Sequence, residues 1–253
     1  ICNEDLVFRS PSIRPDRIMS NAVPICESTY ALSLLNFRKI GITGSDGKTT
    51  TATLTSLLLN EYGKSTFLGG NIGTPIINAV GKTYDYCVCE LSSFQLMYET
   101  PHSVRALITN ISENHLNWHK NMGEYVDAKC NIYRHSPCTR LITNAENELT
   151  SEIAGGLDLP ITYFSSKRTS YSSIVPGGKQ NCSAVYEEGG GIYFGDGEER
   201  ELVLRVSDIR IPGRHNVENY MTAIAVTWGL VSPETVSEIA KSFGGVEHRL
   251  ELV

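Results

Sequence analysis

The chain has 253 residues, with 22 basic and 28 acidic side chains and a formal net charge of −6. This balance argues against a nucleic-acid-binding protein, which usually carries a basic face, but leaves local phosphate binding open. Hydrophobic residues make up 41% of the chain, which is enough for the core of one large domain or two modest ones. No apolar run approaches the length of a membrane span and no leader pattern opens the chain, so we expect a cytoplasmic protein. Because the sequence starts at Ile1 without a methionine, we expect its natural beginning to lie upstream.

The seven cysteines are scattered and form no Cys-x-x-Cys pair. Such a set predicts reduced, buried thiols rather than a disulfide framework. Cys87 and Cys89 lie two apart in an apolar run, so they are predicted to face the same side of a strand.

The first 36 residues predict a short strand at 5–8, a proline-marked loop at 9–15 and a short helix at 29–36. Ligands of open α/β sheets bind at the carboxyl ends of strands, which is where this loop begins. The segment is too small to fold alone, and we interpret it as part of a larger domain.

The stretch 38–51 predicts a strand, a glycine-rich turn and the start of a helix that reaches residue 62. The loop reads Gly41-x-x-Gly44-x-x-Gly47-Lys48-Thr49, with Ile42 where a strict Walker A motif has glycine. Glycines let backbone N–H groups converge on an anion, and the helix start adds its own free N–H groups. Residues 44–50 therefore predict a phosphate loop, in which Lys48 reaches the outer phosphates and the Thr49 hydroxyl binds Mg²⁺.

Two polar side chains follow the next predicted strands. Residues 85–91 form an apolar run that predicts a buried parallel strand, and Glu90 lies at its carboxyl end. A buried carboxylate is costly unless it is paired or bound to a metal, so Glu90 is a candidate Mg²⁺ ligand, with an exposed strand-end glutamate as the alternative. Asn71 lies in a second glycine-rich turn, and the pattern alone favours an ordinary turn asparagine.

The middle of the chain continues the alternation of strands and helices. Strands are predicted at 105–110 and 141–144 and a helix at 122–135. His115 gains weight as a site residue because it also follows the carboxyl end of a strand. Lys129 lies inside the predicted helix, where periodicity alone would place it on a solvated face. This alternation predicts an α/β fold with a doubly wound, mostly parallel sheet.

In residues 161–211 the alternation of strands and helices gives way to short strands separated by glycine turns. This pattern predicts a small antiparallel β appendage. A helix is then predicted to run to Trp228, with Asn216 and Asn219 on one face because they lie three residues apart. A second helix begins after Ser232, which is a suitable N-cap.

Together these motifs resemble the Mur ligase family, and the resemblance covers nearly the whole chain. The phosphate loop lacks the same glycine as the family's loop, and the stretch from Glu90 to Leu96 is the most discriminating. The other motifs appear in the family's order: Gly69-Gly70-Asn71-Ile72-Gly73, Asn110-Ile111-Ser112 with His115, Asp127-Ala128-Lys129, Gly213-Arg214-His215-Asn216 and Glu247-His248-Arg249.

The resemblance implies an ATP-dependent amide ligase of peptidoglycan precursor synthesis, and the Glu90–Leu96 stretch is typical of members that add D-glutamate to UDP-N-acetylmuramoyl-L-alanine. It implies two Mg²⁺ sites, one at Thr49 and Glu90 and one at His115 and Lys129, with the lysine carbamylated by CO₂. Lys48, His115 and Lys129 would be catalytic, and Ser10, Asn71, Ser92 and His115 would contact the nucleotide-sugar substrate. The implied ATP contacts are Gly44, Ser45, Asp46, Gly47, Lys48, Thr49, Thr50, Asn216, Asn219, His248 and Arg249.

The resemblance also implies a domain organisation. Residues 1–36 would be the remnant of an N-terminal UDP-binding domain with a Rossmann-like fold, 37–249 the central ATP-binding domain, and 250–253 the start of a linker to a further domain. We expect a monomer, and we expect residues 1–253 alone to bind nucleotide without completing the reaction. Ser12 stands where the family's UDP-side loop usually has glycine, and Asn114 and Asn117 stand where relatives often have aspartate.

Three other functions compete with this interpretation. A different Mur-type or folylpolyglutamate-type ligase would need another sequence after Glu90. A non-catalytic nucleotide-binding module would leave His115 and Lys129 without a role. A two-metal hydrolase built on a carbamylated lysine would leave the phosphate loop unexplained.

Overall fold

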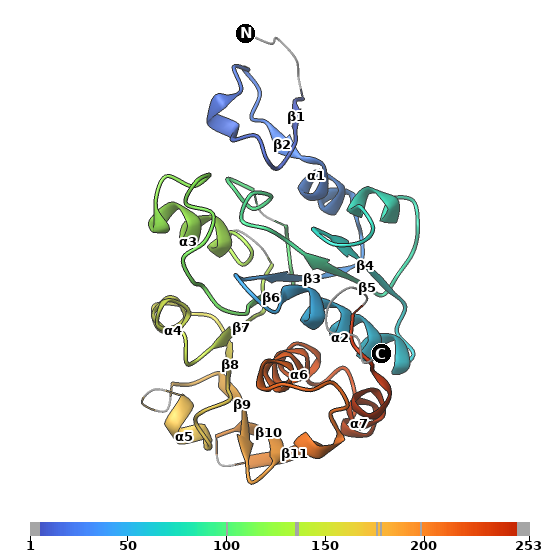
Figure 1. Ribbon diagram of the computed structural model, residues 1–253. Helices are drawn as coiled ribbons and strands as arrows, with labels where there is room; N and C mark the ends of the chain where they lie inside the picture. Colours follow the sequence, from blue (N-terminus) through green and yellow to red (C-terminus); the bar gives the residue numbers. More distant parts are fainter. Residues whose placement is uncertain are drawn as a thin grey trace.

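The computed structural model describes residues 6–99, 101–134, 137–175, 177, 179–197 and 199–246 (Figure 1). Within these residues a nine-stranded sheet has the order β11-β10-β9-β8-β7-β6-β3-β5-β4. Its strands are β3 (Arg38–Thr43), β4 (Thr66–Gly70), β5 (Tyr86–Glu90), β6 (Arg105–Ile108), β7 (Arg140–Asn144), β8 (Ile161–Ser165), β9 (Cys182–Glu188), β10 (Gly191–Asp196) and β11 (Glu199–Arg205).

The sheet is parallel from β4 to β9, and only β10 runs antiparallel to its neighbours β9 and β11. The predicted α/β class with a mostly parallel sheet and a small antiparallel part is confirmed. The antiparallel part begins later than predicted, because β8 pairs in parallel with β7 and β9 joins the same sheet. The glycine turns mark the hairpin correctly but carry no information about the partner of β8.

Helices cover both faces of the sheet, since parallel strands need apolar cover on each side. One apolar cluster lies under α2 (Lys48–Glu61), α6 (Arg214–Thr227) and α7 (Pro233–Ser242). The other lies under α1 (Glu27–Leu34), α3 (Met122–Cys130), α4 (Glu148–Gly155) and α5 (Tyr171–Ile174). Figure 1 shows these two groups on opposite sides of the sheet.

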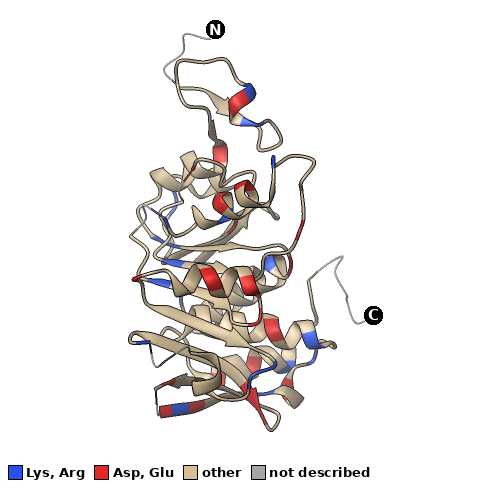
Figure 2. Cartoon of the chain, turned by 90° about the vertical axis from the view of Figure 1, so that its left-hand side faces the viewer, with Lys and Arg blue, Asp and Glu red and all other residues tan. Residues whose placement is uncertain are grey.

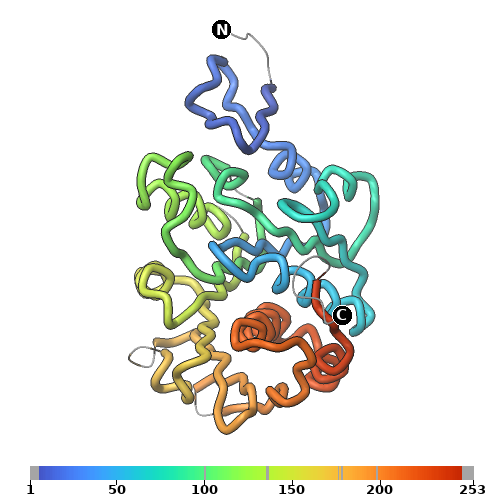
Figure 3. Tube along the Cα trace, in the orientation of Figure 1, coloured from blue at the N-terminus to red at the C-terminus, as the bar shows by residue number. Residues whose placement is uncertain are grey.

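The N-terminal segment forms a separate two-stranded parallel sheet of β1 (Phe8–Arg9) and β2 (Ile25–Cys26), which projects from the rest of the chain in Figure 3. The strand predicted at 5–8 is therefore shifted toward its carboxyl end, and residues 1–5 lie outside the described part. A buried ion pair fastens this segment to the loop between β5 and β6, because Arg9 Nη2 donates to Glu99 Oε1 at 2.7 Å. The α1 helix also packs into the central core through Ala31 and Leu32.

Several other predicted boundaries move. The α2 helix begins at Lys48 rather than at residue 51, and α3 ends at Cys130 rather than at residue 135. The α4 helix was not predicted, although Asn147 caps it by accepting a hydrogen bond from the Thr150 N–H. The cysteines within the described residues are free thiols, and Cys87 and Cys89 share one apolar cluster as expected.

Basic and acidic residues are interspersed over the side of the molecule seen in Figure 2. In the part of the chain that the structure describes, no helix has the length and apolar character needed to cross a membrane.

Candidate functional site

The phosphate loop joins the buried end of β3 to the start of α2. Gly44 has φ +145°, and a Cβ there would lie 1.9 Å from Thr109 Oγ1, so the loop packs too closely for any side chain. Lys48 Nζ donates to the Ser45 carbonyl at 2.8 Å. This curls the ammonium group back over the loop, where the outer phosphates of a nucleotide would lie.

Glu90 is buried at the end of β5 and accepts two side-chain hydrogen bonds. Thr49 Oγ1 donates to Glu90 Oε2 at 2.8 Å, and Asn71 Nδ2 donates to Glu90 Oε1 at 2.9 Å. The interpretation of Asn71 as an ordinary turn residue is therefore wrong, because its side chain orients a buried carboxylate. The hydroxyl and carboxylate oxygens of Thr49 and Glu90 form a pair of hard ligands of the kind that Mg²⁺ prefers.

Lys129 is buried on α3, which corrects the solvated position that periodicity favoured. Its Nζ donates to the Gly44 carbonyl at 2.8 Å and lies 4.6 Å from the centre of the Tyr125 ring. Burial, reinforced by the neighbouring charge of Lys48, lowers the pKa of Lys129 to about 7. A large share of this amine is thus neutral at physiological pH, whereas an ordinary lysine is almost fully protonated.

His115 lies in the loop after β6 with a left-handed backbone, φ +56°. Its ring packs edge-on against Phe94 with 4.9 Å between the ring centres. Burial and the charges of Lys129 and Lys48 lower the pKa of His115, so its imidazole is neutral at pH 7. Asn114 Oδ1 accepts the backbone N–H of His115, which holds the loop in place.

A cavity of about 170 Å³ brings together five predicted site residues besides Gly44 and Ser45 of the phosphate loop. They come from five separate segments of the chain, four of which follow the carboxyl end of a strand, while the fifth is α3. These residues are Lys48, Asn71, Ser92, His115 and Lys129, and Phe94 and Tyr125 complete part of the wall. The ammonium group of Lys48, the amine of Lys129 with its lowered pKa and the neutral imidazole of His115 thus surround one small cavity. This cavity lies beside the Thr49–Glu90 pair.

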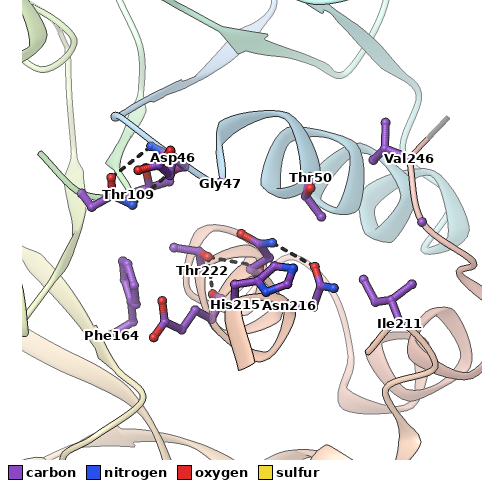
Figure 4. Close-up of a pocket in the computed structure, with 14 residues that line it drawn as sticks. Asp46, Gly47, Thr50, Thr109, Phe164, Ile211, His215, Asn216, Thr222 and Val246 are labelled. Carbon is purple, nitrogen blue, oxygen red and sulfur yellow. Dashed lines mark hydrogen bonds between the residues drawn. The ribbon is translucent and has the colours of Figure 1, made fainter. Parts of the chain in front are cut away.

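A larger pocket of about 430 Å³ lies on the other side of the phosphate loop, between α2 and α6 (Figure 4). Asp46, Gly47 and Thr50 line it from the loop, and Asn216 and Asn219 line it from α6. Gly47 must be glycine here, because its φ is +78° and a Cβ would lie 2.8 Å from Asn219 Oδ1. The predicted position of the two asparagines on one helix face is confirmed, since Asn219 Nδ2 donates to Asn216 Oδ1 at 3.2 Å.

The sequence did not reveal several other residues of this pocket. Phe164 lies on β8 close to its carboxyl end, and His215 and Thr222 come from α6. The strand-end position was a usable signal for Phe164, as it was for Glu90. His248 and Arg249, predicted as ATP contacts, lie outside the described residues.

The N-terminal loop is connected through α3 to the 170 Å³ cavity that Lys48, His115 and Lys129 line, which we call the reactive cavity. Arg14 forms a bidentate pair with Glu124 at 2.8 and 2.9 Å and also donates to the Trp118 carbonyl. His119 is buried beside this pair, and one of its ring nitrogens lies 2.9 Å from Ser93 Oγ. These residues were not predicted, because nothing in their spacing shows that distant segments meet. Predicted Ser10 lies in the same loop, where its hydroxyl is 2.9 Å from that of Ser12, and it lines neither cavity.

Tyr125 extends the same network to the phosphate loop, since its hydroxyl lies 3.0 Å from Ser45 Oγ. It shares a helix face with Lys129, four residues further on, so helical spacing was an available signal. Within the described residues no three His, Cys, Asp or Glu side chains form a metal cluster.

Comparison with known proteins identifies the family. The Mur ligase middle domain matches residues 42–227. The UDP-N-acetylmuramoylalanine–D-glutamate ligase of Ruminiclostridium cellulolyticum is 40% identical over 258 aligned residues, which cover 98% of this chain and 53% of that protein. The ligase of the same name from Clostridium botulinum strain Alaska E43 is 41% identical with the same coverage. The chain thus spans about half the length of the curated relatives it matches.

Solved structures show the same fold at low sequence identity. MurF from Acinetobacter baumannii superposes with a TM-score of 0.66 and 21% identity, over 95% of this chain and 55% of that one. A UDP-N-acetylmuramoyl-L-alanyl-D-glutamate–2,6-diaminopimelate ligase superposes with a TM-score of 0.65 and 16% identity, over 90% and 53% of the two chains. The profile match and the fold agree with the phosphate loop and the reactive cavity, and this chain belongs to the Mur ligase family.

Proposed function

We propose that this chain is the ATP-binding part of a cytoplasmic ligase that adds D-glutamate to UDP-N-acetylmuramoyl-L-alanine during peptidoglycan precursor synthesis. The observation that carries the proposal is the cavity shared by Lys48, Asn71, Ser92, His115 and Lys129. The identity to D-glutamate ligases supports the choice of amino acid. The reaction would pass through an acyl phosphate, which the amine of D-glutamate then attacks.

Charge neutralisation is the main demand of the first step, because a substrate carboxylate must approach the γ-phosphate of ATP. Two unit charges 4 Å apart repel by ~4 kcal/mol at an effective dielectric constant of 20. Lys48 offers an ammonium group at this point. Thr49 and Glu90 fit a Mg²⁺ ion, which when bound would neutralise phosphate charge and polarise the phosphoryl group.

Lys129 fits a carbamate, because carbamylation requires a neutral amine. The neutral amine would form an N–C bond to CO₂ and release one proton, which gives an anionic carbamate with hard oxygen ligands. The lowered pKa of Lys129 raises the neutral fraction at pH 7 roughly a thousand-fold over that of an ordinary lysine. With the neutral imidazole of His115, the carbamate would hold a second Mg²⁺ ion.

The pocket between α2 and α6 would hold the nucleoside. Phe164 offers an apolar surface for the base, and Asn216 and Asn219 offer amide groups to its polar edge or to the ribose. We keep His248 and Arg249 as proposed phosphate and ribose contacts. On the opposite side of the reactive cavity, the loop that carries Ser10 would contact the UDP portion of the substrate.

Isothermal titration calorimetry with ATP and MgCl₂ tests the nucleotide part of this proposal. We expect the 253-residue chain to bind ATP. The variant Glu90→Gln should lose affinity when Mg²⁺ is present and change little when EDTA replaces it. If the ATP affinity of the variant depended on Mg²⁺ as strongly as that of the parent, Glu90 would be excluded as a metal ligand.

The substrate is tested in a chimaeric protein in which this chain is joined to the remaining part of a relative. The assay measures the release of inorganic phosphate from ATP. We expect release to require UDP-N-acetylmuramoyl-L-alanine and to be faster with D-glutamate than with L-lysine or meso-diaminopimelate. A preference for another amino acid would favour a different Mur-type ligase. Phosphate release that no carboxylate substrate affects would favour a simple nucleotide-binding module.

A further inference from the structure

A second polar pocket, of about 310 Å³, lies at the edge of the sheet opposite the phosphate loop. Arg105 and Arg140 line it from the first positions of β6 and β7, and Thr162 and Ser183 line it from β8 and β9. Because a five-residue strand is roughly 17 Å long, this pocket is well separated from the phosphate loop at the other end of the strands.

The two arginines are direct cross-strand neighbours, since Arg105 pairs with Arg140 in the register of β6 and β7. Like charges in directly opposite positions destabilise a sheet. Neither arginine forms an ion pair with a carboxylate in the described part of the chain. Arg38, on the adjacent strand β3, adds a third positive charge to this edge, and burial together with these neighbours lowers the pKa of Arg105.

One of the two arginines has a structural role that explains its presence. Arg105 Nη1 donates to the carbonyls of Val226 and Trp228 at the end of α6, which suits a cation at a helix C-terminus. Arg140 has no such role among the described residues, where its Nη1 donates only to the hydroxyls of Thr162 and Ser183, at 3.0 and 3.1 Å.

One of the two hydroxyl groups has a hydrogen that is available for a further hydrogen bond. Thr162 Oγ1 and Ser183 Oγ lie 2.8 Å apart, so one hydroxyl hydrogen bridges them and the other points elsewhere. Among the described residues no acceptor is recorded for that second hydrogen. The pocket therefore combines uncompensated positive charge with a spare hydroxyl donor, and both features call for an acceptor that carries negative charge.

The carboxylate of Asp196 also lines the pocket, but from β10. Asp196 forms no ion pair with Arg105 or Arg140 in the described part of the chain. This exposed carboxylate is therefore not a direct partner of either guanidinium group.

We propose that this pocket is an anion site, in which Arg105, Arg140 and the hydroxyl pair of Thr162 and Ser183 bind a phosphate or carboxylate group. The planar guanidinium forks suit either group, since both present two acceptor oxygens. The site is distinct from the ATP site, because it lies at the amino ends of the parallel strands.

Binding is tested by calorimetry and by thermal melting with inorganic phosphate, with malonate, and with potassium chloride at matched ionic strength. The Lys48→Gln background is chosen to weaken phosphate binding at the loop, which leaves the contribution of the second pocket easier to measure. In that background we expect phosphate or malonate, but not chloride, to bind and to raise the melting temperature. Additional Arg140→Gln should weaken the affinity at least tenfold, whereas Arg205→Gln, at an exposed arginine of β11, should leave it unchanged.

The response of the two ligands identifies the chemistry. Binding of phosphate alone assigns a phosphate site, and binding of both assigns a general oxyanion site. No binding of either, or equal binding by the Arg140→Gln protein, would overturn the proposal. Without ligand, Arg140→Gln should melt no lower than its parent, because it removes a like-charge pair. Should it fail to fold, Arg140→Lys, which keeps the charge but not the fork, must weaken binding, and equal binding in that variant also overturns the proposal.

Discussion

The buried amine of Lys129 makes a direct prediction about stability and pH. Its pKa falls from 10.5 to about 7 on folding, because burial and Lys48 disfavour the charged form. This fall in pKa corresponds to roughly 5 kcal/mol of destabilisation below pH 7, at about 1.36 kcal/mol per tenfold change in the acid dissociation constant. Between the two pKa values the unfolded chain binds more protons, so stability must rise with pH through this window.

The variant Lys129→Met removes this proton linkage while filling a similar volume. In metal-free, CO₂-free buffer we expect the difference in unfolding free energy between parent and variant to change by roughly 2.5 kcal/mol between pH 6 and pH 9, in favour of the parent at high pH. The variant also loses the hydrogen bond to the Gly44 carbonyl, a constant cost of about 1 kcal/mol that leaves the slope unchanged.

Urea unfolding under reducing conditions measures this difference at each pH. Lys82→Met, at an exposed lysine, is the matched control and should show no pH-dependent difference from the parent. If the Lys129→Met difference were as flat with pH as the control, the amine would titrate normally, and the argument for a neutral lysine at pH 7 would fail.

Two further substitutions test the loop and the N-terminal contact. Gly47→Ala should lower stability by more than Gly81→Ala, because both glycines have φ near +80° but only the first would place a Cβ against Asn219, and equal melting temperatures would contradict the close approach. Arg14→Ala should cost ~1–3 kcal/mol by leaving Glu124 without its bidentate partner. Since this pairing lowers the pKa of Glu124 to about 2, the cost should be fully present above pH 4.5 and fade as pH falls toward 2, and a cost unchanged by pH would exclude the pair as its source.

Local patterns predicted the parts of the site that depend on one stretch of chain. The order of strand, glycine turn and helix defined the phosphate loop, because each piece has a direct sequence signal. Glu90 was identified as a candidate ligand since a carboxylate at the end of an apolar strand needs a partner, and Thr49 and Asn71 supply it.

Positions that depend on packing between distant segments were not accessible to pattern alone. Periodicity placed Lys129 toward solvent, because α3 contains few apolar residues to mark its buried face. The structure turns that face toward the phosphate loop, and only the family resemblance pointed to Lys129 as a site residue. The meeting of Arg14 with Glu124 likewise depends on a contact across 110 residues. Strand β8 was assigned to the antiparallel part because its sequence does not indicate which strand it pairs with.

The proposed function depends most on a neutral, CO₂-reactive lysine beside the phosphate loop. Carbon-13 NMR of the chain in ¹³C-bicarbonate with MgCl₂ tests it most directly. We predict a carbamate carbonyl signal that is present in the parent, absent in Lys129→Met and unchanged in Lys82→Met. A parent spectrum without this signal, or the same signal in Lys129→Met, would contradict the account.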